Sequence, residues 1–125
     1  MGVIVLVEDQ YENARLARRL LEAAGHVVHV AVDGEAGLTA IFDVQPDLVL
    51  MDLGLPDIDG QTVIGILRQE ASMKHVPLVA FTAYPEQIAH DLGAAYGCSG
   101  VISKPIDTRR FVAQVNAFLE TSHAE

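Results

Sequence analysis

The sequence predicts one α/β domain of the (βα)5 class, in which a doubly wound parallel sheet of five strands is covered by helices on both faces. Short apolar runs alternate with amphipathic segments five times along the 125 residues. The apolar runs are continuous rather than alternating, which is typical of parallel strands buried on both faces. No repeat or linker interrupts the pattern, and a chain of this length can bury a core as a single domain.

Five short runs rich in valine, isoleucine and leucine predict the strands. The first and third, "VIVLV" and "LVLM", contain no polar residue, whereas "HVVHVAV" alternates weakly. Turn formers in "GLPDIDG" separate the third run from the helix that follows it. The predicted strands are residues 3–7, 26–32, 48–51, 76–83 and 100–103.

The segments between these runs predict five helices, because apolar residues recur in them at a spacing of three or four. In the first segment, Ala14, Ala17 and Leu21 lie on one face, and Gly25 provides a stop. Asp33 is a plausible N-cap for the second helix, and Pro85 suits the first turn of the fourth. The predicted helices are residues 10–25, 33–44, 61–71, 85–96 and 107–120.

Composition narrows the functional class. A net charge of −9 argues against direct nucleic-acid binding and favours a cation or a basic partner. Cys98 is the only cysteine, so no internal disulfide is possible and a reducing cytoplasm fits best. We expect Cys98 to be buried rather than reactive. No apolar run approaches the roughly 20 residues of a membrane span, and the start lacks a signal-peptide pattern. The five histidines show no paired spacing and are expected at the surface.

Acidic residues follow two of the most apolar strands. Glu8 and Asp9 come directly after the first strand, and Asp52 follows the third. Ligands of open parallel sheets bind beyond the carboxyl ends of the strands, so these three carboxylates are expected to converge in one crevice. Their mutual repulsion requires protons or a cation. Hard oxygen donors without histidine or cysteine beside them favour Mg²⁺, with Mn²⁺ possible, over Zn²⁺.

Two further polar residues close strands. Thr82 ends the fourth strand with a hydroxyl, and Lys104 ends the fifth with an ammonium group. Carboxylates, a hard cation, a hydroxyl and an ammonium together indicate phosphoryl transfer, in which positioning and charge neutralisation carry most of the catalysis. The sequence has no P-loop or G-x-G-x-x-G motif to hold a nucleotide. The phosphoryl group is therefore expected from a small donor or another protein.

Four stretches carry a family resemblance: "VLVED", "PDLVLMDLGLPDIDG", "VPLVAFTA" and "GCSGVISKPI". Asp52, Thr82 and Lys104 are separated by 30 and 22 residues, which matches the same family without a gap. From residue 3 to about 119 the sequence resembles the receiver domain of two-component response regulators, of the single-domain, chemotaxis-regulator-like kind, with residues 120–125 as a polar tail. The resemblance implies a flavodoxin-like receiver fold with strand order 2-1-3-4-5.

The resemblance also implies a role for each matched residue around the phosphoryl group. Asp52 would be the phosphoacceptor, taking the group from a histidine kinase or a histidine phosphotransfer protein. Lys104 and the Thr82 hydroxyl would hold phosphoryl oxygens, and Ala83 would leave room for the group to enter. Pro105 stands at the family's cis-peptide position.

The implied metal ligands are Asp9, Asp52 and the backbone carbonyl of Gly54, with Glu8 acting through a metal-bound water. Asp57 and Asp59 are interpreted as residues that solvate the loop and start the next helix, rather than as ligands.

One position departs from the family pattern. Three residues before the lysine, receivers commonly carry a tyrosine or phenylalanine that reports phosphorylation, and here that position is Val101. Valine is too small and too stiff at χ1 for that motion. Tyr84, two residues after the switch residue Thr82, is the candidate substitute aromatic. The resemblance implies output to a downstream protein through helix four, strand five and helix five.

The function that best fits is a phosphoacceptor signalling module that catalyses its own phosphorylation and slow dephosphorylation, and not a turnover enzyme. One alternative is a Mg²⁺-dependent phosphatase with an aspartate nucleophile, which would need a second aspartate where Gly54 stands. A receiver excised from a hybrid histidine kinase and a degenerate receiver used as a scaffold are further alternatives. All 125 residues belong to the one domain, so no DNA-binding effector and no membrane partner are expected.

Overall fold

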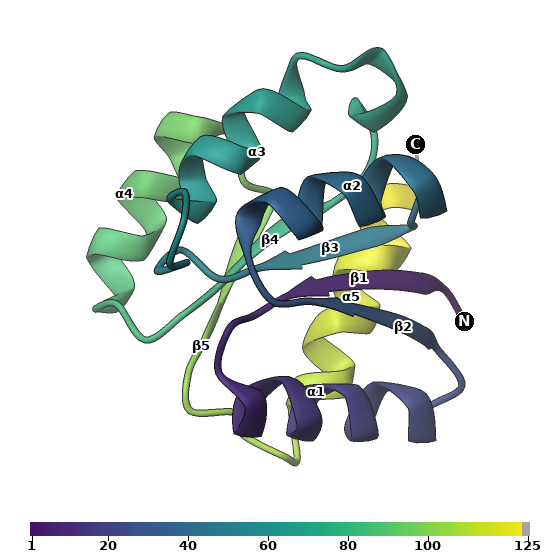
Figure 1. The fold of residues 1–125 in the computed structure, drawn as a ribbon. Coiled ribbons are helices and arrows are strands. Elements are labelled where there is room, and N and C mark those ends of the chain that lie inside the picture. Colours follow the sequence, from purple (N-terminus) through teal and green to yellow (C-terminus); the bar gives the residue numbers. More distant parts are fainter. Residues whose placement is uncertain (124–125) are drawn as a thin grey trace.

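The computed structural model describes residues 1–123 and contains a five-stranded parallel sheet flanked by helices (Figure 1). The strand order is β2-β1-β3-β4-β5, as the family resemblance implies. Three strands have the predicted bounds, and β2 and β4 are one or two residues shorter at each end than predicted. The strands are β1 (Val3–Val7), β2 (Val27–Ala31), β3 (Leu48–Met51), β4 (Leu78–Thr82) and β5 (Gly100–Ser103).

Five α-helices connect and follow the strands, and they differ from the predicted segments mainly at their ends. The helices are α1 (Tyr11–Ala23), α2 (Gly34–Val44), α3 (Gly60–Arg68), α4 (Glu86–Tyr96) and α5 (Phe111–His123), with a short 3-10 turn, η1 (Ala71–Met73), after α3. The last helix starts four residues later than predicted, because the chain first makes a turn in which the Phe111 N–H donates to the Asp107 carbonyl. It also continues past residue 120, into the expected polar tail, whose residues 124–125 lie outside the described part. Within residues 1–123, no helix is long and apolar enough to cross a membrane.

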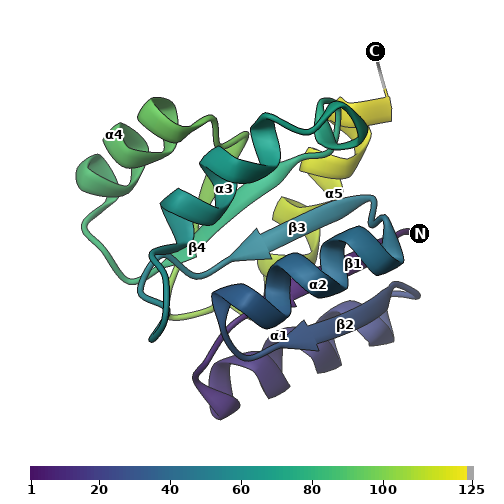
Figure 2. The same ribbon diagram turned by 45° about the horizontal axis from the view of Figure 1, so that its top comes forward.

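The sheet separates two apolar layers. Helices α1 and α5 cover one face, while α2, α3 and α4 cover the other (Figures 1 and 2). Along β1, Ile4 and Leu6 pack towards α1 and α5, and Val5 and Val7 pack towards the opposite layer. Both faces of the strand are therefore buried, which explains why the strand sequences are continuously apolar.

Predicted helix ends are confirmed at α1 and α2. The Asp33 side chain accepts a hydrogen bond from the Ala36 N–H at 2.8 Å, as expected of an N-cap. Gly25, two residues beyond the end of α1, has a φ of +95°, a conformation that glycine adopts without strain. The peptide bond between Lys104 and Pro105 is cis.

Arg68, the last residue of α3, connects three separate segments. Its guanidinium donates to the carbonyl of Gly97 at the end of α4, to the carbonyls of Met73 and Val76 before β4, and to the Ser99 hydroxyl before β5. The helix predicted to extend to residue 71 ends at Arg68 and is followed by η1, whose Met73 carbonyl receives one of these bonds, while the Val76 carbonyl three residues later receives another. Burial raises the pKa of the neighbouring Cys98 thiol to about 11, in keeping with the expected low reactivity.

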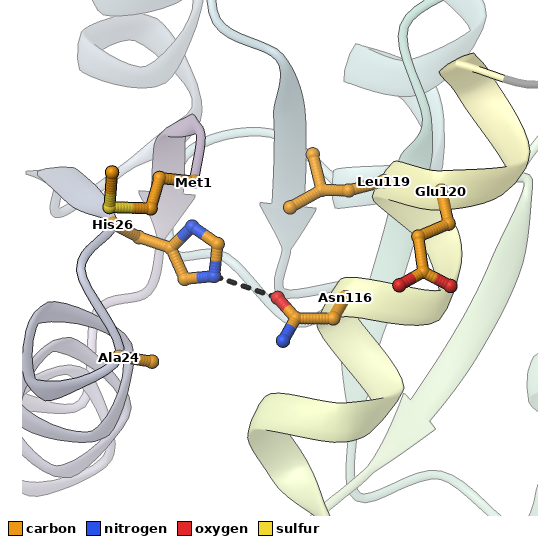
Figure 3. A pocket seen from close by; sticks show the side chains of 6 residues that line it. All are labelled: Met1, Ala24, His26, Asn116, Leu119 and Glu120. Carbon is orange, nitrogen blue, oxygen red and sulfur yellow. Dashed lines mark hydrogen bonds between the residues drawn. The ribbon is translucent and has the colours of Figure 1, made fainter.

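His26 corrects the expectation that the histidines lie at the surface. It is 6% exposed, whereas His29, His75 and His90 are exposed. Its Nδ1 accepts from the Gly2 N–H at 2.9 Å, so Nε2 carries the proton and donates to Asn116 Oδ1 at 2.8 Å (Figure 3). The ring joins the start of β2 to the start of β1 and to α5, beside a cavity of about 230 Å³.

We expect His26→Ala to lower the free energy of unfolding by about 1–3 kcal/mol, because it leaves the Gly2 N–H and the Asn116 carbonyl oxygen without their partner. Urea denaturation measures the change. The matched control is His29→Ala, since His29 is an exposed histidine three residues later, on β2, and its effect should stay within about 0.5 kcal/mol. Equal effects of the two substitutions would contradict a structural role for His26.

Candidate functional site

Three carboxylates meet at the carboxyl edge of the sheet. Glu8 and Asp9 follow β1, and Asp52 follows the neighbouring strand β3. Each of the three residues offers an oxygen within 4.8 Å of the others' oxygens. The predicted convergence of these residues is therefore present in the structure, and it results from the parallel pairing of β1 with β3.

Asp52 is held in place by backbone contacts. Its N–H donates to the Val7 carbonyl at 2.9 Å, which continues the β1–β3 pairing by one residue. Its Oδ1 accepts the Gly54 N–H at 2.9 Å, so the start of the following loop curls back onto the carboxylate. The start of α3 packs on the same residue, since a Cβ on Gly60 would lie 2.0 Å from the Asp52 backbone oxygen. Only glycine fits at that position.

Lys104 supplies the positive charge that faces the carboxylates. Its Nζ forms an ion pair with Glu8 Oε1 and lies 3.5 Å from Asp52 Oδ2. The side chain is only 10% exposed, and Nζ lies 4.9 Å from the centroid of the Phe81 ring. Sequence reasoning did not identify Phe81 as part of the site. The ring shields one side of the ammonium group from water and attracts it through the ring quadrupole.

Glu8 is the most enclosed of the three acids, with its side chain fully buried. Oε2 accepts the Gln10 N–H at 3.0 Å, while Oε1 meets Lys104. Burial raises the pKa of Glu8, and the nearby Asp52 charge acts in the same direction; the bonds from Lys104 and Gln10 lower it only in part. The ion pair with Lys104 therefore does not fully offset the cost of burying the Glu8 carboxylate.

The remaining predicted residues lie on the β4 and β5 side. Thr82 is buried at the end of β4, where its carbonyl accepts the Lys104 N–H at 2.8 Å and its hydroxyl accepts the Tyr84 N–H at 3.0 Å. Ala83 is exposed. Tyr84 is 40% exposed, whereas Val101 is half-buried and packs into the layer under α3 and α4. Neither Tyr84 nor Val101 belongs to the carboxylate cluster.

The donor set suits a hard divalent cation. Three carboxylates and one ammonium leave an excess of two negative charges when all four groups are ionised. The raised pKa of Glu8 comes mainly from burial, with a smaller contribution from the Asp52 charge. Mg²⁺ takes oxygen ligands and tolerates few protein groups because it keeps several waters. Asp9 and Asp52 would bind it directly together with the Gly54 carbonyl, and Glu8 would act through water.

Asp57 has a different role from the predicted one. Its carboxylate does not start α3, but accepts the N–H groups of Gly34 and Glu35 at the beginning of α2, at 2.8 and 3.0 Å. These bonds lower the pKa of Asp57. Asp59 stands directly before α3, yet its side chain makes no capping bond. Sequence reasoning missed the Asp57 contact because its partners lie 22 and 23 residues away.

A parallel sheet in the order 2-1-3-4-5, with an acidic pocket and a facing lysine at its carboxyl edge, is the arrangement of a response-regulator receiver domain. The chain belongs to this family, whose sequence profile, the response regulator receiver domain, matches residues 4–116.

Known relatives agree with the family assignment. The polar-differentiation response regulator DivK of Brucella anthropi is 33% identical over 116 residues, which cover 93% of this chain and 94% of that protein. A response regulator from Chloroflexus aurantiacus superposes with a TM-score of 0.90 at 29% identity, covering 95% of this chain and 98% of the other. The chemotaxis regulator CheY4 of Vibrio cholerae, at 21% identity, shares the fold with a TM-score of 0.89, covering 94% of this chain and 98% of the other.

Without divalent metal, we expect Glu8 to make the domain less stable as pH rises. A carboxyl group whose folded pKa is raised keeps its proton more tightly in the folded state, so stability is lost as pH rises from its ordinary value of 4.5 through the raised value. The difference in unfolding free energy between wild type and Glu8→Gln should therefore fall as pH rises above 4.5.

Urea denaturation in the presence of a chelator measures this difference. Glu12→Gln, at an exposed glutamate on α1, is the matched control and should not show this fall. A difference that grows with pH at Glu8 would mean that the carboxylate form is favoured by folding, which contradicts the direction given above.

Proposed function

We propose that this receiver domain is a phosphoacceptor: Asp52 takes a phosphoryl group from a histidine kinase or a histidine phosphotransfer protein with Mg²⁺ bound beside it. The observation that carries the proposal is the convergence of Asp52 with Glu8, Asp9 and Lys104 at one edge of the sheet. Family membership supports the class of reaction and the class of donor.

In the proposed reaction, an oxygen of the ionised Asp52 carboxylate attacks the phosphorus atom of a phosphohistidine. The new O–P bond forms as the P–N bond breaks, and the electron pair of that bond leaves with the imidazole. Lys104, only 3.5 Å from Asp52 Oδ2, is placed to balance charge on the phosphoryl oxygens. The Thr82 hydroxyl would hold another oxygen, and the exposed Ala83 would leave the entrance open. When bound, Mg²⁺ supplies charge neutralisation for the group in transfer.

We infer that the domain acts as a switch and not as a turnover enzyme. A phosphatase with an aspartate nucleophile needs a second carboxyl group two residues on to exchange protons with the leaving group. Gly54 at this position has no side chain, and its N–H donates to Asp52 Oδ1. The acyl phosphate on Asp52 would then persist until water slowly hydrolyses it.

The output surface is proposed to lie on α4, β5 and α5. Tyr84, two residues before α4, and Ile88, in the first turn of α4, are 40% and 50% exposed. The Tyr84 N–H is bonded directly to the Thr82 hydroxyl, so a hydroxyl that turns to a phosphoryl oxygen changes the surroundings of Tyr84. Val101 has no comparable link, because it packs in the core layer under α3 and α4.

Incubation with phosphoramidate or acetyl phosphate and Mg²⁺ should give a single phosphoryl adduct, detected by intact mass, that is lost in Asp52→Asn. The control is Asp59→Asn, an exposed aspartate seven residues later, which should retain the wild-type yield. Asp9→Asn should lose most of the adduct, since it removes a proposed metal ligand while leaving the acceptor intact. An adduct of wild-type yield on Asp52→Asn would refute the assignment.

Tyr84→Ala should weaken phosphorylation-dependent partner binding by about fivefold or more, a typical coupling effect, whereas Val101→Ala should change it little. A beryllofluoride-loaded protein should likewise show larger NMR shift changes at residue 84 and at residues 86–92 than at residue 101. Binding is measured against the downstream partner, with and without the phosphoryl mimic. The reverse ranking of the two variants would show that Val101 is the switch despite its size.

A further inference from the structure

We propose that Asp57 is a positioning residue for the metal site, because it latches the loop that carries the Gly54 carbonyl onto the start of α2. The inference rests on the proposed Mg²⁺-dependent function and adds the residues that hold the two halves of its metal pocket together. It concerns the loop of residues 53–59, which joins β3 to α3.

A backbone carbonyl is a ligand whose position depends on the loop alone, since it has no side-chain rotamer to adjust. The two ends of this loop are fixed. Leu53 and Leu55 are buried near its start, and the Gly60 N–H donates to the Leu53 carbonyl at 3.3 Å. Between Leu55 and Gly60, the loop is held against α2 by Asp57 and Ile58.

The latch consists of two hydrogen bonds to α2 and one packing contact, and a third hydrogen bond inside the loop orients the Asp57 carboxylate. Asp57 Oδ1 accepts the N–H groups of Gly34 and Ile58, at 2.8 and 2.9 Å, and Oδ2 accepts the Glu35 N–H at 3.0 Å. Ile58 lies directly over Gly34, because a Cβ built on Gly34 would come within 2.0 Å of Ile58 Cγ2. The loop therefore both binds to the first turn of α2 and fits against its glycine.

The helix that receives the latch rests on the other half of the pocket. α2 packs on β1 and β2 and lies beside α3 on the same face of the sheet (Figure 2). Its Gly37 approaches the last residue of β1 so closely that a Cβ there would lie 2.8 Å from Val7 Cγ2. Glu8 and Asp9 follow Val7 directly. Asp57 thus connects the Gly54 side of the pocket, through α2, to the strand end that carries the other two acids.

A simple helix cap would not require this arrangement. Asp33 already caps α2 locally by accepting the Ala36 N–H, and its backbone carbonyl accepts the Gly37 N–H. The Gly34 and Glu35 N–H groups are instead satisfied from the metal-site loop. Substituting a residue that orients a metal ligand typically weakens metal affinity by about 10–100-fold.

The test compares Asp57→Ala with Asp59→Ala, which removes the same charge from the same loop at a side chain that makes no capping bond. Mg²⁺ titration followed by NMR should show an affinity about tenfold weaker for Asp57→Ala. Asp59→Ala should differ from wild type by less than about twofold, through loss of a distant, screened charge. Equal losses in the two variants would overturn the inference.

A second variant and a metal-free measurement separate positioning from stability. Gly34→Ala forces Ile58 off the helix without changing any charge, and it should weaken Mg²⁺ binding in the same way as Asp57→Ala. In metal-free protein, hydrogen exchange at the Gly54 amide should accelerate in Asp57→Ala and Gly34→Ala but not in Asp59→Ala; unchanged exchange would count against the latch. If wild type itself fails to bind Mg²⁺ or to accept phosphoryl groups, the proposed function fails. If wild type does both and the Asp57 and Asp59 variants are alike, only the latch fails.

Discussion

The arrangement of this domain depends on the mutual repulsion of Glu8, Asp9 and Asp52. Two like charges about 4 Å apart repel by roughly 4 kcal/mol at an effective dielectric near 20. The parallel pairing of β1 with β3 nevertheless places the three acids at the same edge, with oxygens within 4.8 Å of one another. One lysine, held over the Phe81 ring, opposes them. Folding thus creates a local excess of negative charge, which suits the binding of a cation, and a bound cation would in turn offset the charge of an incoming phosphoryl group.

The position of the strands and the identity of the acidic cluster could be predicted from the sequence for one physical reason. A parallel sheet buried on both faces requires continuous apolar runs, and the residues that follow those runs necessarily share an edge. Helix ends were less predictable: α3 stops where Arg68 turns to neighbouring carbonyls, and α5 starts only after a turn at residues 107–110. Contacts over long sequence distances were not predictable. His26 meets Asn116 across 90 residues, and Asp57 meets Gly34 across 23, and no local pattern marks either pair.

Val101 stands where receivers commonly carry a tyrosine or phenylalanine, and its packing limits how β5 can pass a change in the core to the surface. In this chain the position contributes a β-branched side chain to the layer under α3 and α4, where it lies near Gly93 and Cys98. A stiff residue in a packed layer has few alternative rotamers. The Thr82 hydroxyl, by contrast, is bonded to a backbone N–H at the start of the exposed segment that leads into α4. These contacts support the proposal that a change at Thr82 is carried by the β4–α4 connection rather than by Val101.

Arg68 anchors the C-terminal end of α4 by hydrogen bonds that differ in kind from the contacts at its N-terminal end. Its four hydrogen bonds end on three backbone carbonyls and one hydroxyl, all of which are neutral. A bond between a fixed cation and neutral dipoles involves no partner that gains or loses a proton near neutral pH, and its partial burial limits screening by salt. The connection at the start of α4 leads directly to a pocket of ionisable groups. Ionic strength, pH and metal concentration are therefore expected to leave the Arg68 anchorage at the C-terminal end of α4 unchanged, whereas the N-terminal connection leads towards groups that respond to all three.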